Sequence, residues 1–373
     1  MHLLSLFGGW MSDRLQMGKG SISLGGGLSL LGYFLSGMYG GSFFSFFFIG
    51  WGYALFKPAI SSLLGHSYTL NRERGFSFSY LTSLLGNFFA AILAGFMRHQ
   101  WGFIALFWSG MICFFLVFVA SLALPSNLFP STMESPSLEL PALFLKKAKR
   151  ESKLLFFLLL SFSTLHYGTH HICHSLLIPH MQIHLDRIWR GKELPVTWLA
   201  SLHIPLQIVT TFYLPNIWRT FRRFLKMNRL STMHKLSIGA LSSTFAFFLF
   251  SLTTHPFLYS SSGKQSLYCF FPFYFVSLLF FLFSSVCVNA TLWSTLFSLA
   301  PCQYKSFTMA LILLSICIGS LFSSLLFFFT RDLSIHHFFA QIGILTSLLS
   351  PPILYLAKKQ CRATDLNRKA LSL

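Results

Sequence analysis

Long apolar runs alternate with short polar segments along the whole chain. One helical span needs about 20 apolar residues, and ten runs reach that length. They lie at about 21–40, 43–64, 76–97, 101–124, 154–178, 195–217, 236–256, 267–297, 306–330 and 334–357. Apolar and polar residues do not alternate within them, which argues against the strands of a membrane β-barrel. The pattern predicts an all-α integral membrane protein, a helical bundle of about ten transmembrane helices.

The composition supports this prediction. Of the 373 residues, 54% are apolar and 10% are charged, whereas about a quarter of the residues of a soluble domain are charged. So much apolar surface excludes an ordinary soluble fold and a disordered chain. The seven cysteines form no C-x-x-C pair, and no phosphate-binding loop is present, so we expect no cofactor. A catalytic triad would need a buried acid that the apolar runs lack, so we expect no enzyme.

The net charge of +19 is distributed unevenly. If all ten runs cross the membrane, 21 of the 28 Lys and Arg residues lie on one side and six on the other. Because cations concentrate on the cytoplasmic side of membrane proteins, we expect a multi-pass protein with both termini in the cytoplasm, in a cell (inner) membrane. The cations fall between apolar runs and form no separate basic domain, so nucleic acid is not an expected partner.

The longest hydrophilic stretch, Pro125–Lys153, contains four prolines and a basic cluster. Such a stretch is typical of a linker. It divides the chain into an incomplete N-terminal bundle (1–124), a cytoplasmic linker (125–153), a C-terminal six-helix bundle (154–357) and a basic cytoplasmic tail (358–373). Transporters built from two six-helix halves have about twelve spans. We therefore expect Met1–Phe7 to be the last turns of a truncated span.

Gly8–Gly18 reads GGWMSDRLQMG and lies in a predicted cytoplasmic loop. It resembles the loop motif G-x-x-x-D-R-x-x-G between the second and third helices of the major facilitator superfamily, although Asp13 to Gly18 is one residue longer. An anion such as Asp13 is favoured near a helix N-terminus, and Arg14 can pair across a bundle interface. The resemblance implies that these two residues form a gate that holds one face closed. The alternative is a solvated turn.

A second segment, Gly50–Gly65, reads GWGYALFKPAISSLLG. It resembles the fourth helix of the proton-dependent oligopeptide transporter (POT) family, G-x-G-x-x-K-P-x-x-S. Lys57, Pro58 and Ser61 keep that spacing, and Ala54 replaces the second glycine. The segment RERGFSFSY that follows resembles F-x-x-x-Y on the fifth helix of the family. The similarity is most specific before the linker.

The resemblance implies a major facilitator-type bundle that works by alternating access, here in the proton-coupled uptake of di- or tripeptides. Small peptides, protons and the lipid bilayer would then be its partners. In the family, the lysine at the position of Lys57 takes part in peptide binding and proton coupling. The first helix of the family, with its E-x-x-E-R-F motif, and most of the second have no counterpart in this sequence.

Lys57 is a candidate on physical grounds as well. A charge at mid-membrane costs on the order of 3 kcal/mol and persists where it lines a cavity or has a partner. Lys57 lies deep in its run, too far along for easy snorkelling. Pro58 weakens the adjacent helix hydrogen bonds, as in the broken helices around transporter sites. The alternative is a lysine that reaches the nearer interface.

No acidic residue lies deep in a predicted span. The nine acids are Asp13, Glu73, Glu134, Glu139, Glu151, Asp186, Glu193, Asp332 and Asp365. By resemblance, the family's tenth-helix glutamate would fall near Ser285. Its eighth-helix asparagine would fall near His203.

Histidines can titrate in place of these carboxylates, because their charge changes near neutral pH. His166, His170 and His174 repeat every four residues and share a helix face. With His203, they are candidates for substrate binding and proton coupling. Two alternatives remain for His166, His170 and His174: they bind a shared metal ion, or they make polar contacts between helices.

Other functions also remain open for the whole chain. One is the transport of another small solute, by uniport or with histidine-based proton coupling. A second is a truncated or degenerate paralogue that does not transport. A membrane enzyme is a third.

Overall fold

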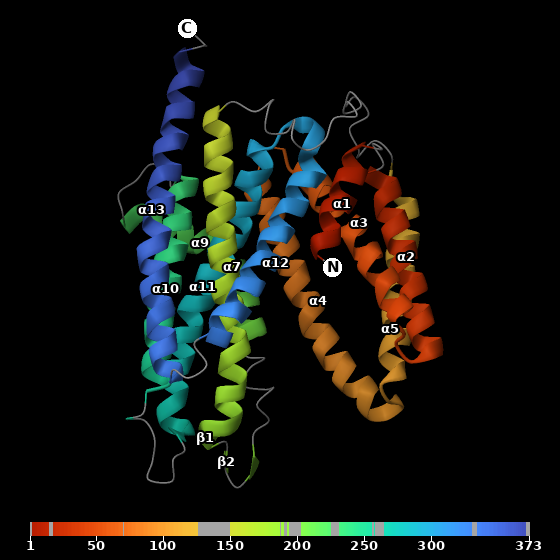
Figure 1. Cartoon of the computed structure of the whole chain (residues 1–373), viewed down its shortest axis with the longest axis horizontal. Helices are drawn as coiled ribbons and strands as arrows, with labels where there is room; N and C mark the ends of the chain where they lie inside the picture. The colour runs from red at the N-terminus through yellow and green to blue at the C-terminus, as the bar shows by residue number, and fades with distance from the viewer. Residues whose placement is uncertain are drawn as a thin grey trace. The chain divides into compact units, whose positions relative to one another are not determined.

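The chain folds mainly into helices in its computed structural model (Figure 1). The structure describes residues 2–14, 18–69, 71–125, 150–186, 188–189, 192–193, 203–224, 231–255, 257, 265–329 and 334–370. Its helices are α1 (His2–Arg14), α2 (Gly18–Tyr39), α3 (Phe43–Ser67), α4 (Arg72–Trp101), α5 (Ile104–Ala123), α7 (Arg150–His184), α9 (His203–Phe224), α10 (Thr232–Thr253), α11 (Leu267–Leu299), α12 (Lys305–Phe329) and α13 (Ile335–Ala370). A 3₁₀ turn at Cys302–Tyr304 precedes α12. The strands form two short ladders, in which β1 (Leu185–Asp186) is parallel to β4 (Gln265–Ser266) and β2 (Ile188–Trp189) is antiparallel to β3 (Lys192–Glu193).

The predicted all-α fold class is confirmed, because a helix coincides with each of the ten predicted spans. Within the described residues, eight helices are long and apolar enough to cross a membrane. Helices α7 and α9 are not among the eight, since six histidines in α7 and three arginines in α9 make them more polar. Helix α9 continues beyond its predicted end near residue 217, because no helix-breaking residue follows Pro215. The predicted start of that span, at 195–202, lies outside the described residues.

The predicted loop at Gly8–Gly18 is wrong for its first half, since α1 stays helical as far as Arg14. Its glycines do not form a turn but allow close packing between helices. A Cβ on Gly8 would lie 2.1 Å from the carbonyl oxygen of Ala54 in α3. A Cβ on Gly9 would lie 2.7 Å from the carbonyl oxygen of Ser306 in α12. Only glycine permits such close approach of backbones.

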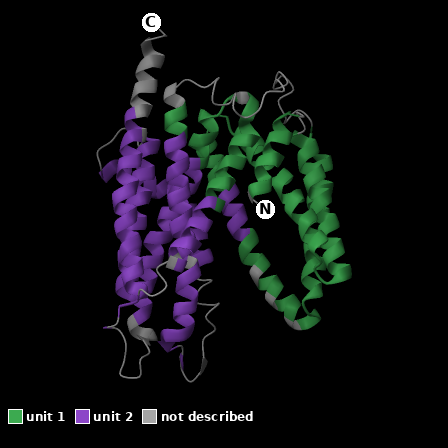
Figure 2. Cartoon of the chain, viewed as in Figure 1, with its two compact units in different colours: residues 1–78, 86–156, 293–317 green, residues 79–85, 157–292, 318–373 purple. Residues whose placement is uncertain are grey.

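The described residues form two compact units (Figure 2). Unit 1 comprises residues 1–78, 86–156 and 293–317. Within it, α2 packs along α3 and α5, and α1 packs along α3. Small residues make the contact between α2 and α3, since Gly25 lies against the Gly52 carbonyl. This is the small-residue packing common between membrane helices.

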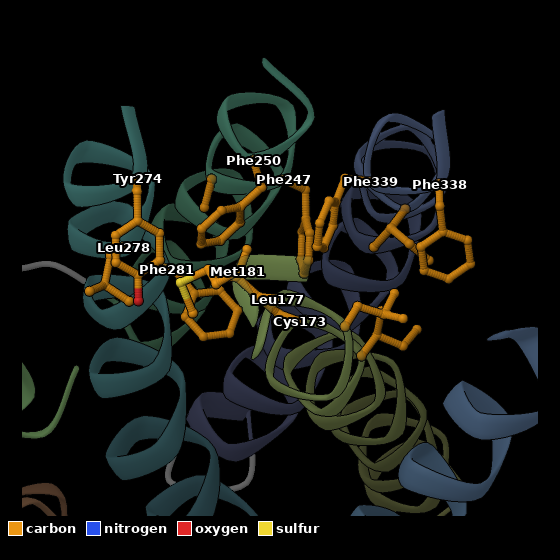
Figure 3. Packing of buried hydrophobic residues seen from close by; sticks show 14 of the residues in the cluster. Cys173, Leu177, Met181, Phe247, Phe250, Tyr274, Leu278, Phe281, Phe338 and Phe339 are labelled. Atoms are coloured by element: carbon orange, nitrogen blue, oxygen red, sulfur yellow. The ribbon is translucent and has the colours of Figure 1, made fainter. Parts of the chain in front are cut away.

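Unit 2 comprises residues 79–85, 157–292 and 318–373. Within it, α10 packs along α13, and aromatic rings fill the core beside this pair (Figure 3). The ring centroids of Phe250 and Phe281 lie 5.9 Å apart in an edge-on arrangement, and those of Phe250 and Phe339 lie 5.7 Å apart. These rings join α10, α11 and α13 through the aromatic geometry that adds stability beyond simple burial.

The predicted division into bundles, linker and tail remains a prediction. Most of the predicted linker, residues 126–149, lies outside the described residues. Within the predicted tail, α13 continues as a helix to Ala370. Residues 358–370 contain no proline or glycine that would end the helix earlier.

Candidate functional site

Lys57 lies inside α3, immediately before a helix-interior proline. Pro58 has no N–H to donate to the Ala54 carbonyl, and Gly8 of α1 packs against that same carbonyl. The Ser61 hydroxyl donates to the Lys57 carbonyl over 3.0 Å. The helix therefore lacks one backbone hydrogen bond, to the Ala54 carbonyl, within a turn of Lys57.

Neighbours of Lys57 along α3 pack against α1 and α2. Ala54 lies against α1, and Gly52 and Phe56 lie against α2. Lys57 itself is half-buried, and no charged group among the described residues acts on it. A half-buried cation without a charged partner inside an apolar span is a functional hypothesis by default.

Asp13, at the end of α1, caps the N-terminus of α12. Its carboxylate accepts hydrogen bonds from the backbone N–H groups of Ser306 (2.9 Å) and Phe307 (2.7 Å). Burial raises the pKa of Asp13 to about 7, although these hydrogen bonds and the charge of Lys305 act in the opposite direction. The carboxyl group is therefore placed to titrate near neutral pH at a contact between two helices.

Lys305 is a buried cation beside this contact. Its Nζ donates to the carbonyls of Phe297 (2.6 Å) and Ala300 (2.8 Å), and so caps the C-terminus of α11. Arg14 lies over the ring of Trp10 in its own helix, 5.0 Å from the ring centroid. The structure thus places Asp13 at a helix N-terminus, whereas the predicted pairing of Arg14 across a bundle interface stays a prediction.

Two of the predicted histidines come together on α7. The ring centroids of His166 and His170 lie 4.3 Å apart, and the ring of His170 stacks on Phe281 at 3.9 Å. His166 is buried, and its Nε2 has no hydrogen-bond partner among the described residues. The side chain of His174 lies outside the described residues, and His203 is the half-buried first residue of α9.

The metal alternative for these histidines finds no support in the described part of the chain. There, no group of three or more His, Cys, Asp or Glu side chains is arranged to hold a metal ion. The ring of His170 instead packs against the aromatic ring of Phe281 in α11.

A network of neutral polar side chains lies within unit 2, and we call it the Tyr80 network. Its members are Tyr80 of α4, Tyr167 of α7, Gln207 of α9, and Ser285 and Asn289 of α11. The Tyr80 hydroxyl lies 3.0 Å from Ser285 Oγ, and Gln207 Nε2 donates to both hydroxyls. Asn289 Nδ2 donates to Ser285 Oγ over 3.2 Å, and its Oδ1 accepts from the Tyr167 hydroxyl. The network offers several hydrogen-bonding groups and no formal charge.

Sequence analysis did not assign this network as a site. In the sequence, Tyr80 is marked only by its place in the F-x-x-x-Y motif. Ser285 is marked only because the tenth-helix glutamate of the family would fall near it. The resemblance was the one signal that pointed to Ser285, since neutral polar residues are common along the whole chain.

Long apolar helices with an embedded lysine and a buried polar network define a multi-pass membrane protein of the transporter class. The chain belongs to the Major Facilitator Superfamily, whose sequence profile matches residues 1–363. It is accordingly a membrane transporter and not an enzyme, as predicted.

Two curated relatives match part of the chain. A di-/tripeptide transporter of Lactococcus lactis subsp. lactis (strain IL1403) is 34% identical over 101 residues, which are 26% of this chain and 20% of that protein. A di-/tripeptide transporter of Lactococcus lactis subsp. cremoris matches over the same length. The matched segment is thus about a fifth of the length of these curated relatives (20%).

Solved structures of POT family transporters share the fold. One such structure, in complex with a thioalcohol-conjugated peptide, has a TM-score of 0.72 at 18% identity and covers 96% of this chain and 85% of that chain. A peptide transporter in complex with sulfate has a TM-score of 0.70 at 20% identity and covers 97% of this chain and 84% of that chain. The predicted major facilitator-type bundle is therefore confirmed.

Proposed function

We propose that the protein takes up di- or tripeptides together with protons, by alternating access. The observation that carries this proposal is the 34% identity over 101 residues to a di-/tripeptide transporter of Lactococcus lactis. The fold supports it, since transporters of the POT family have the same architecture over 96% of this chain. No specific observation favours a different solute.

Lys57 supplies the charge that a peptide substrate needs. A peptide carries a carboxylate at its C-terminus, and a charge-assisted hydrogen bond from an ammonium group stabilises it strongly in a poorly hydrated place. The Tyr80 network supplies hydroxyl and amide groups of the kind that bond to peptide N–H and C=O groups. We assign Lys57 to the carboxylate and the Tyr80 network to neutral parts of the substrate.

Histidines carry the proton in this proposal. His166 and His170 are 4.3 Å apart between ring centroids, and two cations that close repel each other. The pair therefore holds one proton more readily than two, as a relay requires. His174 and His203 extend the relay as the sequence pattern predicts, and lipid and protons are the remaining partners.

Asp13 and Arg14 form the proposed gate. The hydrogen bonds from Ser306 and Phe307 to Asp13 hold α1 to the start of α12. We propose that this contact must break when the protein changes conformation. In this proposal the two predicted bundles, 1–124 and 154–357, move relative to each other. Both termini lie in the cytoplasm, and the protein lies in a cell membrane.

Uptake of a labelled dipeptide into proteoliposomes tests the proposal. We expect uptake to require an inward proton gradient and to fall about tenfold or more in Lys57→Ala, since each lost factor of ten corresponds to about 1.4 kcal/mol of binding. Lys359→Ala is the matched control, because Lys359 is exposed and lies beyond the span of α13. This control should transport like the wild type.

Two outcomes would contradict the proposal. Uptake that depends neither on the proton gradient nor on Lys57 would refute both the proposed proton coupling and the proposed role of Lys57. Gradient-driven uptake of a different solute, with no competition by dipeptides, would leave the transporter class intact but refute the substrate.

A further inference from the structure

A groove of about 270 Å³ lies between α10 and α13 in unit 2. These helices lie side by side in Figure 1. Two threonines line the groove, and the Thr244 hydroxyl donates to that of Thr346 over 3.1 Å. Its rim is apolar and open, since Leu241 is 63% exposed and Tyr355 is 68% exposed. Neither Lys57, the candidate histidines nor the members of the Tyr80 network line this groove.

The position of the groove along the helices places it at a membrane surface. The apolar span of α13 ends at Leu356, and Lys358 follows two residues later. Helix α10 begins at Thr232, and its Ser237 lines the same groove as Lys358. One end of the groove therefore lies at the depth of the lipid head groups, and the other reaches into the hydrocarbon layer.

The side chains are arranged as a phospholipid requires. Lys358 is half-buried at the head-group end and makes no hydrogen bond or ion pair with any described residue. Ser350, which lines the same groove, also has a hydroxyl without a bonded partner there. Tyr355 adds a phenol at interfacial depth, where aromatic residues are favoured. Leu241 supplies an apolar surface for an acyl chain.

We propose that this groove binds one anionic phospholipid, with its phosphate on Lys358 and an acyl chain along Leu241. Charge complementarity selects the occupant, since the groove contains one cation and no acidic residue. Basic pockets between transmembrane helices are known to hold anionic head groups. The net charge of +19 favours an anionic over a zwitterionic lipid at such a site.

Native mass spectrometry of the purified full chain tests the proposal. The detergent-solubilised protein is titrated with phosphatidylglycerol or with phosphatidylcholine of the same acyl chains. We expect one phosphatidylglycerol to bind in preference to phosphatidylcholine and its affinity to fall about fivefold in Lys358→Gln, since one cation near a lipid surface contributes about 1 kcal/mol. Lys359→Gln is the matched control, because this neighbour is exposed and does not line the groove; it should change the affinity less than twofold.

A second variant blocks the groove without changing its charge. Ala240 is buried in the groove wall, and Ala240→Phe should exclude the lipid while its melting temperature reports on folding. Equal losses in the two lysine variants, or equal binding of both lipids, would overturn the proposal in favour of a general surface charge. Dimers that Ala240→Phe dissociates would show instead that a second copy covers the groove. Lipid binding is measured without transport, so the peptide proposal can fail separately.

Discussion

A single carboxylate, Asp13, makes the contact between α1 and α12 sensitive to pH. Burial raises its pKa to about 7 from the ordinary value of 3.8, so the folded chain holds this proton more tightly than the unfolded chain does. The stability that this proton contributes is fully present below about pH 4 and is lost as the pH rises through about 7. The folded protein is therefore less stable against unfolding when Asp13 is ionised than when it is protonated, even though the carboxylate accepts two backbone hydrogen bonds.

The neutral variant Asp13→Asn should lack this pH dependence. We expect the melting temperature of the wild type, minus that of Asp13→Asn, to decrease between about pH 5 and about pH 8. Thermal unfolding of both proteins in the same detergent, at several pH values, measures the difference. A difference that stays constant or increases with pH would show that burial does not dominate the pKa of Asp13.

The Tyr80 hydroxyl is the hub of a network that also carries a prediction. In Tyr80→Phe the ring remains, but Gln207 and Ser285 lose a shared partner. Gln207 and Ser285 keep the hydrogen bond between them, so the expected cost is that of a lost hydrogen bond, about 0.5–1.5 kcal/mol. We therefore expect a lower melting temperature and, because the network is assigned to the substrate, a raised KM for dipeptide.

Tyr213→Phe is the control for Tyr80→Phe. Tyr213 lies on α9 and is 52% exposed, so loss of its hydroxyl should change neither stability nor KM. A Tyr80→Phe variant with a lower melting temperature and an unchanged KM would limit the network to a structural role.

Sequence alone could predict the charged candidates but not this network. Lys57 and Asp13 stand out because a charge in or beside an apolar run is expensive and therefore rare. Tyr80 and Ser285 carry no such signal, and they lie 205 residues apart in the chain. Only the folded arrangement of α4, α9 and α11 brings their hydroxyls together.

Among the helices, α1 depends on glycine for its position. A Cβ on Gly8 would lie 2.1 Å from a backbone oxygen of α3, and backbone atoms cannot move aside as a flexible side chain can. Gly8→Ala should therefore cost about 1–3 kcal/mol through overpacking and lower the melting temperature.

Gly86→Ala is the matched control for Gly8→Ala. Gly86 lies within α4, and a Cβ there would meet nothing within 4 Å. Because alanine favours helix by about 1 kcal/mol over glycine, this variant should be neutral or slightly stabilised. Equal destabilisation in both variants would mean that glycine acts through backbone flexibility and not through helix packing.

Apolar run length predicted the existence of the helices well, and their ends less well. A run of apolar residues that crosses a bilayer by itself forms a helix, because every backbone polar group must be bonded within the segment. The ends depend on tertiary packing. Gly8 and Gly9 belong to the predicted loop, yet they are helical and pack closely against α3 and α12. Lys305 lies between two predicted spans, yet it is buried and caps α11.

For the whole molecule, the distribution of cations predicts the orientation in the membrane. On the predicted topology, 21 of the 28 Lys and Arg residues lie on one side of the membrane. Cations near span ends resist translocation, and acidic residues contribute little to orientation. From so strong a bias we predict one orientation, with the linker, Lys358 and both termini on the cytoplasmic side.

Reporter fusions after Leu373 test this orientation. A green fluorescent protein fused there should fluoresce, because it folds well in the cytoplasm, and an alkaline phosphatase fused there should stay inactive, because its disulfides form only in an oxidising compartment. A matched pair of fusions after Ser260, in the predicted external segment between the spans at 236–256 and 267–297, should give the opposite result. If both positions reported the same side, an even number of crossings would separate them, and the assignment of α11, α12 and α13 as three spans would be wrong. If both reporters were reversed, the groove at Lys358 would face the outer leaflet, and the positive-inside bias would not govern this chain.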